Sequence, residues 1–245
     1  MSEFRHVQAE LLRPGQVRDR LEKRSVVYIP IGAFEFHQEH LPFGLDALNA
    51  HGLTCLTASR SGGIVLPPLY YGTGGSHKNY PWTIMMDGET EIRRELEKTL
   101  SRLQEFDVRV AVLFTGHFAP EQLEMIASIA DEWRAAGNRM SVVSLGINMP
   151  LNGTPSPDHA GVFETTVLSR FQPDTIDISQ LPGIDEAPSV DPDGDPYGVH
   201  RHDPDHVLWG VFGPDPRNFR AEDADALTIT ISDAIERAVS DALNN

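Results

Sequence analysis

The sequence has little cysteine, few basic residues and no long apolar run. A single cysteine among 245 residues, Cys55, excludes a disulfide within the chain and fits a reducing compartment. The 20 Lys and Arg stand against 36 Asp and Glu, and the formal net charge of −16 argues against nucleic acid or an anionic membrane as a partner. No apolar run approaches the ~20 residues of a membrane span, and the polar N-terminus shows no signal peptide. We therefore expect a cytoplasmic protein without a nucleic-acid or membrane partner.

Motifs of covalent catalysis and nucleotide binding are also missing. No G-x-S-x-G is present, so the sequence offers no serine on a nucleophile elbow. Cys55 lies in a predicted helix with no basic neighbour, which favours a buried structural thiol over a nucleophile. No G-x-G-x-x-G opens a helix after the first predicted strand, which argues against a Rossmann-like nucleotide-binding module.

Apolar runs alternate with amphipathic stretches along most of the chain. Runs that are rich in β-branched residues and apolar at both odd and even positions predict strands buried on both faces. The predicted strands span 25–31, 64–66, 108–114 and 140–145, and the predicted helices span 46–60, 89–106, 120–136 and 221–243. This alternation predicts an α/β fold with a mostly parallel sheet covered by helices, in which ligands collect at the carboxyl ends of the strands.

We expect a single domain over residues 1–245, with an irregular excursion at about 172–216. The excursion is rich in Pro, Asp and Gly and has little periodicity. A loop of this length is typical of a lid or an interface arm, and the sequence leaves both open. Its DPDGDP stretch departs from a calcium loop at the sixth and twelfth positions. Its histidines at 200, 202 and 206 fit a solvated loop over the active site, or across to a neighbouring subunit, better than a zinc site.

The first candidate site is GAFEFHQEHLPFGLD, residues 32–46. Glu35 and His37 are two residues apart, so an extended backbone projects both side chains to the same side. Asp46 follows a turn and begins a predicted helix, where a carboxylate is favoured. Carboxylates and imidazoles gathered at a strand's carboxyl end suit Zn²⁺ or Mn²⁺. The alternative is a polar loop whose side chains only cap the helix.

Two further segments place histidines between a strand or loop and a helix. His117 follows the buried strand 108–114, and we expect Gly116 to let the backbone turn tightly so that the imidazole points into the crevice above the sheet. In DHAGVFETT (158–166), Asp158 and His159 precede a predicted helix that carries Glu164 in its first turn. Glu164 would serve either the helix dipole or a metal ion, with His159 or Asp158 moving protons beside it.

The glycine-rich segment YYGTGGSHKNYPWT, residues 70–83, is the candidate substrate-side loop. We expect Ser76, His77, Tyr80 and Trp82 to line the substrate pocket, although a plain surface turn is the alternative. The segment lacks the G-K-S/T ending of a phosphate-binding P-loop.

Three of these segments together resemble the creatininase (creatinine amidohydrolase) family. The order G-x-x-E-x-H-x-x-H-L-P-x-x-x-D, then G-H, then H-A-G-V-F-E-T covers most of the chain from about residue 25 to 168. The resemblance implies a three-layer αβα fold, a centre of two divalent ions (Zn and/or Mn), and a homo-oligomer, specifically a hexamer. It also implies hydrolysis of small, often cyclic, amides.

Carried over to this sequence, the resemblance assigns individual roles. Glu35 and His117 would hold one ion, His37 would hold the other, and Asp46 would bridge the two. His159 would donate a proton near the substrate. His40 would support the ligands without binding metal.

The sequence also departs from creatininase. Ala119 stands where creatininase has a carboxylate, and Glu164 is our candidate for the missing ligand. Pro155 stands where creatininase has a substrate-enclosing tryptophan, and Asp158 replaces a glutamate. We therefore expect a substrate other than creatinine.

The predicted function is hydrolysis of a small cyclic amide or related carbonyl compound by a metal-activated water. An alternative within the same family is ring opening of a cyclic polyol ketone of the inosose type. An alternative of another class is a metal- or ligand-binding relative without turnover, in which the loss at Ala119 has removed one ion.

Overall fold

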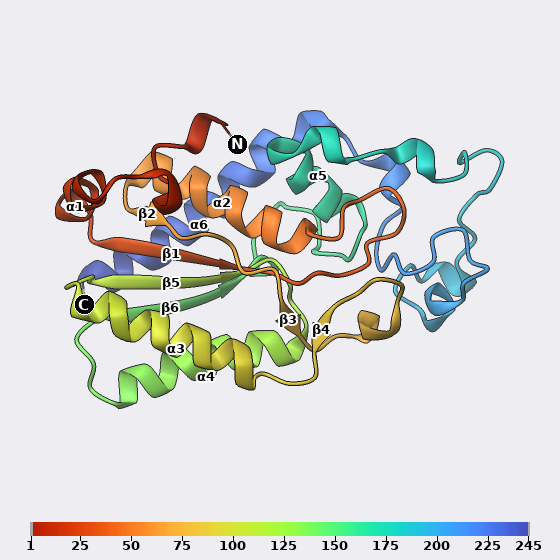
Figure 1. Ribbon diagram of the computed structural model, residues 1–245. Coiled ribbons are helices and arrows are strands. Elements are labelled where there is room, and N and C mark those ends of the chain that lie inside the picture. Colours follow the sequence, from red (N-terminus) through yellow and green to blue (C-terminus); the bar gives the residue numbers. More distant parts are fainter. Residues whose placement is uncertain (1, 245) are drawn as a thin grey trace.

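The computed structural model describes residues 2–244 and is built around one parallel sheet. Its strands lie in the order β2 (Ile64–Val65), β1 (Val26–Ile31), β5 (Val110–Thr115) and β6 (Ser141–Gly146) (Figure 1). Every residue of β1 and β5 is buried, as expected for central strands that are covered on both faces. The four predicted strands are therefore confirmed to within two residues.

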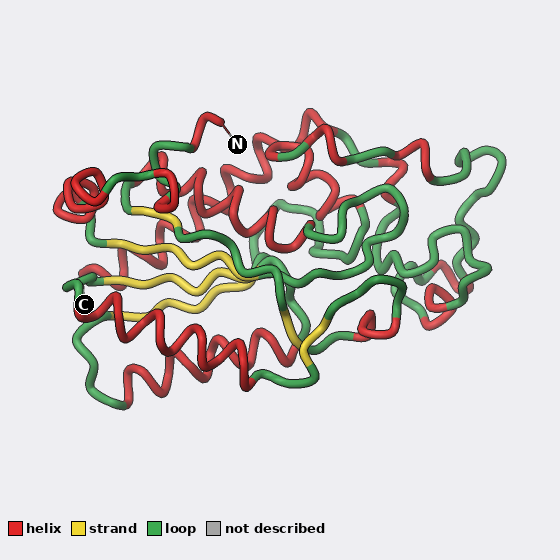
Figure 2. The backbone as a smooth tube through the Cα atoms, viewed as in Figure 1, coloured by secondary structure: helices red, strands yellow, loops and turns green. Residues whose placement is uncertain are grey.

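Helices cover both faces of this sheet (Figures 1 and 2). On one face lie α2 (Leu45–Ser61), α5 (Val162–Phe171) and α6 (Ala224–Asn244), and on the other lie α3 (Thr90–Glu105) and α4 (Pro120–Ala135). A separate apolar core fills each interface between helices and sheet. The predicted three-layer αβα fold with a parallel central sheet is confirmed.

Several elements were not predicted from the sequence. The helix α1 (Pro14–Lys23) packs Val17 and Leu21 against the core that α3 and α4 share. Two short strands, β3 (Gly72–Thr73) and β4 (Met85–Met86), form a separate parallel pair. The 3₁₀ helices are Ser2–Phe4, Ala9–Leu11, Ser76–Asn79, Pro173–Thr175, Ile178–Gln180, Pro192–Gly194, Val199–His202, Pro216–Asn218 and Ala221–Asp223.

The excursion at 172–216 contains only short 3₁₀ turns within the described residues. It lies beyond the carboxyl ends of the sheet strands (Figure 1). Its role as lid or interface arm, and the single-domain organisation, stay predictions at this point. No helix between residues 2 and 244 is long and apolar enough to cross a membrane.

The first turn of α2 closes against the ends of β1 and β5. Ile31 of β1 pairs with Thr115 of β5, so the loops that follow both strands start at the same level. A Cβ atom at Gly116 would collide with the backbone carbonyl of Asp46, the second residue of α2. The chain bends at Gly116 as expected, but the φ of Gly116 is not positive, so a left-handed backbone is not why glycine stands there. Glycine is needed because the start of α2 approaches the strand end so closely.

We predict that Gly116→Ala destabilises the protein by about 1–3 kcal/mol, as overpacking of a close backbone contact does. Urea unfolding followed by circular dichroism measures the change. Gly88→Ala is the control, because a Cβ there meets no atom within 4 Å. Equal stability of the two variants would show that α2 does not depend on this approach.

Candidate metal centre

Four buried side chains meet beyond the carboxyl ends of β1 and β5. Glu35 and His37 follow β1, Asp46 lies in the first turn of α2, and His117 follows β5. None is more than 6 % exposed. The sequence predicted that these loops would be neighbours, and the structure brings all four side chains together.

The first group of ligand atoms surrounds His117. Its Nδ1 atom lies 2.8 Å from Glu35 Oε2 and 3.3 Å from Asp46 Oδ2. The Thr115 hydroxyl holds this loop, because it donates to the His117 carbonyl (2.6 Å) and accepts from the Gln122 amide (2.8 Å). His117 is therefore fixed from behind while its Nδ1 faces two carboxylates.

The second group surrounds His37. Its Nδ1 lies 2.9 Å from the Glu35 carbonyl oxygen, which can only accept, so Nδ1 carries the hydrogen. Its Nε2 lies 3.2 Å from Asp46 Oδ1 and 3.7 Å from Glu164 Oε2. The two oxygens of Asp46 thus face different groups, the arrangement that a bridging carboxylate requires.

Several of these buried atoms have no hydrogen-bond partner within residues 2–244. They are Glu35 Oε2, His37 Nε2, Asp46 Oδ2 and His117 Nε2. Glu35 Oε2 lies close to His117 Nδ1, but the geometry does not make a hydrogen bond. Unpartnered buried polar atoms are rare and cost about 1–3 kcal/mol each. Carboxylate oxygens and imidazole nitrogens crowded in this way fit Zn²⁺ or Mn²⁺.

Asp158 and Glu164 lie at the start of α5. The carboxylate of Asp158 accepts hydrogen bonds from the backbone N–H groups of Phe163 (2.8 Å) and Glu164 (3.1 Å), and burial raises its pKa to about 7. Glu164 Oε2 accepts from the Ala160 N–H at 2.6 Å while facing His37. Asp158 is thus engaged in holding the helix start, whereas Glu164 reaches the candidate centre. The metal role of Glu164 and the catalytic role of Asp158 stay predictions.

His159 lies between two other imidazoles. Its ring stacks on His37 with the centroids 4.3 Å apart and on His77 with the centroids 3.8 Å apart. Its Nε2 is 3.0 Å from the Phe36 carbonyl oxygen, and its Nδ1 is 3.8 Å from Glu35 Oε1. Burial, then the charges of His77 and His37, hold the pKa of His159 well below its usual range.

His40, which the resemblance makes a support for the ligands, is buried with both ring nitrogens lacking a hydrogen bond to any described residue. Burial, then the charge of His37, lowers the pKa of His40 to about 4. The imidazole is therefore neutral near pH 7. Its supporting role stays a prediction.

A cavity of about 240 Å³ opens onto the candidate centre. Of the four residues predicted to contact substrate, Ser76 and His77 line it. Tyr80 instead packs between Phe36 and Trp209, and Trp82 is 80 % exposed and outside the lining.

Two aromatic cavity walls, Phe118 and Phe212, were not singled out from the sequence. Phe118 directly follows the predicted ligand His117, so its position in the sequence already indicated that it lies near the cavity. Phe212 belongs to the excursion and reaches the cavity by pairing with His159. Nothing in its local sequence indicated that contact.

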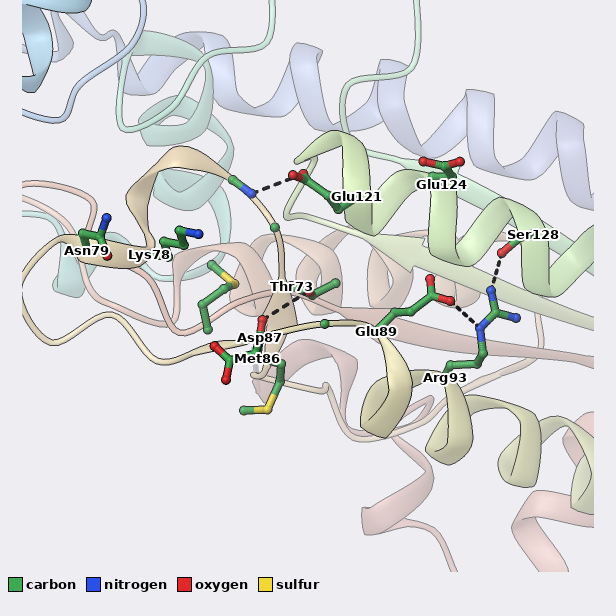
Figure 3. A pocket seen from close by; sticks show the side chains of 14 residues that line it. Thr73, Lys78, Asn79, Met86, Asp87, Glu89, Arg93, Glu121, Glu124 and Ser128 are labelled. Carbon is green, nitrogen blue, oxygen red and sulfur yellow. Dashed lines mark hydrogen bonds and ion pairs between the residues drawn. The ribbon is translucent and has the colours of Figure 1, made fainter.

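A second, polar hollow of about 690 Å³ lies behind the glycine-rich loop (Figure 3). Gly75 lines both this hollow and the cavity at the candidate centre. The N–H of Gly75 donates to Glu121 Oε2 (3.3 Å), and the N–H of Thr73 donates to Gln122 Oε1 (2.9 Å). The loop that carries Ser76 and His77 is therefore anchored to the start of α4, the element that follows His117.

Comparison with known proteins agrees with the geometry. The family model for creatininase, described as creatinine amidohydrolase, matches residues 10–239. The chain belongs to the creatininase family. The prediction of a hydrolase is thereby confirmed at the level of the family.

Individual relatives are about a quarter identical to this chain over the aligned residues. Creatinine amidohydrolase of Pseudomonas putida is 28% identical over 202 residues, which are 73% of this chain and 75% of that protein. A mycofactocin precursor peptide peptidase of Mycolicibacterium smegmatis is 27% identical over 64% of this chain and 62% of that protein. The chain thus resembles proteins that are named for different substrates, creatinine and a precursor peptide.

Solved creatininase structures have the same fold. A crystal structure of creatinine amidohydrolase (creatininase) matches with a TM-score of 0.75 at 24% identity, covering 98% of both chains. A structure described as creatininase Mn has a TM-score of 0.73 at 23% identity, covering 98% of this chain and 99% of the other. A creatininase variant described as Zn-Zn type has a TM-score of 0.72 at 24% identity with the same coverage.

We predict that metal binding releases protons. Burial alone would lower the pKa of His37, but Asp46, Glu164 and Glu35 outweigh it and raise the pKa to about 10. Burial would also lower the pKa of His117, but Glu35 and Asp46 outweigh it and raise this pKa well above its usual range. A cation can bind these nitrogens only after their protons leave. Affinity should therefore rise with pH up to about 10, by about tenfold per pH unit for each proton displaced.

Calorimetry of Mn²⁺ binding to metal-free protein, in buffers of different ionisation enthalpy, counts the released protons. We expect at least one proton per chain at pH 7. The control is His37→Gln, which should release one proton fewer. Binding without proton release would contradict the proposed ligation by these imidazoles.

Proposed function

We propose that this protein is a metal-dependent hydrolase that opens a small cyclic amide, or a related carbonyl compound, other than creatinine. The observation that carries the proposal is Asp46, whose two oxygens face separate clusters of imidazole and carboxylate atoms. One cluster contains Glu35 and His117, and the other contains His37 and Glu164. We propose these clusters as the ligands of two divalent ions, Zn²⁺ or Mn²⁺, in agreement with the descriptions of the related creatininases.

When bound, divalent ions supply Lewis-acid chemistry, because they polarise a carbonyl and lower the pKa of a water molecule. The protein's part is to hold the ligands. His37 is oriented by the hydrogen bond of its Nδ1 to the Glu35 carbonyl, and His117 by the loop that Thr115 and Gln122 hold. Such supporting hydrogen bonds fix the tautomer and direction of a ligand.

His159 is proposed as the residue that moves the proton. Its Nε2–H donates to the Phe36 carbonyl, so the free lone pair is on Nδ1, on the side of Glu35. Its low pKa keeps this imidazole neutral at rest. It therefore first accepts a proton from the attacking water at Nδ1 and then donates it to the leaving amine. Asp158 contributes by holding the start of α5.

The cavity walls favour a partly apolar substrate. Phe118, Ala119, Pro120 and Phe212 form the apolar part of the wall. Apolar walls of this kind give little stabilisation to a polyol ring, whose hydroxyls would lose hydrogen bonds to water. A cyclic amide is thus favoured over the inosose-type ketone. Ser76 and His77 are proposed as its polar contacts, and Tyr80 and Trp82 lie outside this wall.

The family resemblance also suggests a homo-oligomer, a hexamer, in the cytoplasm. Trp82, Val190 and Val199 are apolar side chains that are more than three-quarters exposed in the single chain. A neighbouring subunit would cover such side chains. The assembly and the location remain proposals.

Metal content and hydrolysis test this function together. We expect elemental analysis to find two ions per chain in the parent, none in Asp46→Ala and one in Glu164→Gln. Asp46→Ala should also lose hydrolysis of a panel of lactams and formamides, because both ions share that carboxylate. The control is Glu124→Ala, an exposed carboxylate outside the cavity, which should keep both ions.

Full metal content in Asp46→Ala would refute the bridging role. A parent that holds one ion or none after Mn²⁺ or Zn²⁺ is supplied would instead support a relative without turnover. Hydrolysis of cyclic polyol ketones but of no amide would shift the substrate class while leaving the metal centre intact.

A further inference from the structure

Part of the excursion is fastened directly to the loops of the candidate centre. We call residues 200–212 the inner arm. The contacts are His77 Nε2 with the Gly210 carbonyl (3.1 Å), Gln38 Nε2 with the Trp209 carbonyl (2.9 Å), and two backbone hydrogen bonds between His159 and Phe212 (2.8 and 2.9 Å). The inner arm thus contacts His77 and His159, two residues of the proposed active site, from outside the sheet.

Arg201 lies at the root of the inner arm and is completely buried. Its Nη1 donates to the Val211 carbonyl at 3.0 Å, and its own carbonyl accepts from the Gly210 N–H at 2.7 Å. Gly210 and Val211 immediately precede Phe212. Arg201 therefore bonds, through its side chain and its carbonyl, the stretch of backbone that in turn bonds both active-site histidines.

The guanidinium of Arg201 is held by Asp191, further back in the excursion. Its Nε donates to Asp191 Oδ1 (2.5 Å) and its Nη2 donates to Asp191 Oδ2 (2.8 Å), a two-point ion pair of the kind that fixes direction as well as distance. Asp191 also accepts from Ser189 and lies 3.0 Å from His200 Nε2. Although Asp191, His200 and His206 could be grouped as metal ligands, the carboxylate already has a cation as its partner.

A second ion pair, at the end of the excursion, provides a comparison with a purely structural role. Arg217 and Asp215 are buried to a similar degree and also bond at two points. Arg217, however, donates to the carbonyls of Pro182 and Ala187, which are not in the inner arm. The two pairs match in chemistry and differ in the backbone that they hold.

We infer that Arg201, held by Asp191, is a positioning residue that fixes the orientation of His77 and His159 through the inner arm. The excursion is then a fixed wall of the site and not a lid that opens. Burying a charged pair costs solvation and adds little net stability, so it is better explained by the single geometry that it imposes. The inference rests on the proposed function, because it assigns the wall to the same catalytic cavity.

Trp209 provides a direct report on the inner arm. Its indole packs against Tyr80, with ring centroids 5.0 Å apart, and against Phe36, at 5.2 Å. With Trp82 and Trp133 replaced by Phe, the fluorescence of Trp209 and its quenching by acrylamide follow the arm, whether or not the protein turns over any substrate.

The experiment compares Asp191→Asn with Asp215→Asn in metal-loaded protein. Asp191→Asn should lower kcat/KM for the best amide substrate by about 10–100-fold, the usual cost of losing an orienting partner. It should also increase quenching of Trp209, while two ions per chain remain bound. Asp215→Asn should keep the parent's kcat/KM and quenching, and Asp191→Glu, which retains the ion pair, should recover most of the activity.

If the two Asn variants lose activity equally, in proportion to their fall in Tm, Arg201 only stabilises the fold. That result would overturn the inference. Increased quenching with unchanged kcat/KM would overturn it too, because the arm would then move without affecting the histidines. Failure of the proposed function is recognised separately, since the parent itself would then bind fewer than two ions or hydrolyse nothing, while the quenching comparison still tests the hold of Asp191 on Arg201.

Discussion

The closing of α2 against the ends of β1 and β5 is the contact on which the rest of the site depends. Asp46 is in the first turn of that helix, and its carbonyl occupies the space that a side chain at Gly116 would need. Because the backbones approach so closely, the carboxylate reaches between the loop of Glu35 and His37 and the loop of His117. A helix displaced outwards by one side-chain layer would leave two separate half-sites.

Gathering these groups in a buried place has an electrostatic cost. Burial raises the pKa of a carboxylate, and it raises that of Glu164 well above its usual range. Glu35 shows the opposite net shift, because the charge of His117 beside it opposes burial and its pKa lies well below the usual range. In metal-free protein, protons on imidazoles thus provide the positive charge that the carboxylates require. Bound divalent ions would provide this positive charge instead. They would be held by atoms that now lack hydrogen-bond partners among the described residues, such as Asp46 Oδ2 and His37 Nε2.

Much of this arrangement could be predicted from sequence because it depends on local regularity. Buried parallel strands are apolar at every position, and their carboxyl ends meet at one edge of the sheet, so Glu35, His37 and His117 were expected as neighbours. The close contact of Gly116 with the start of α2 was not predicted, because an approach between elements distant in sequence leaves no local signature. The placement of Tyr80 and Phe212 depends on contacts between the glycine-rich loop and the excursion. Neither segment has a periodicity from which such contacts could be inferred.

The proposed metal ligands and the cavity walls are held in place in different ways, and this difference has a functional consequence. The proposed ligands follow strand ends or lie at helix starts, where the packed sheet fixes their positions. The cavity walls come from the glycine-rich loop, from Phe118 and Ala119, and from the excursion, whose backbone is set by side-chain bonds such as those of Arg201. Loops held in this way can be rebuilt without disturbing the sheet. The proposed metal ligands and the cavity walls thus depend on separate parts of the chain, and Ala119, which lines the cavity two residues after His117, lies on the boundary between the two.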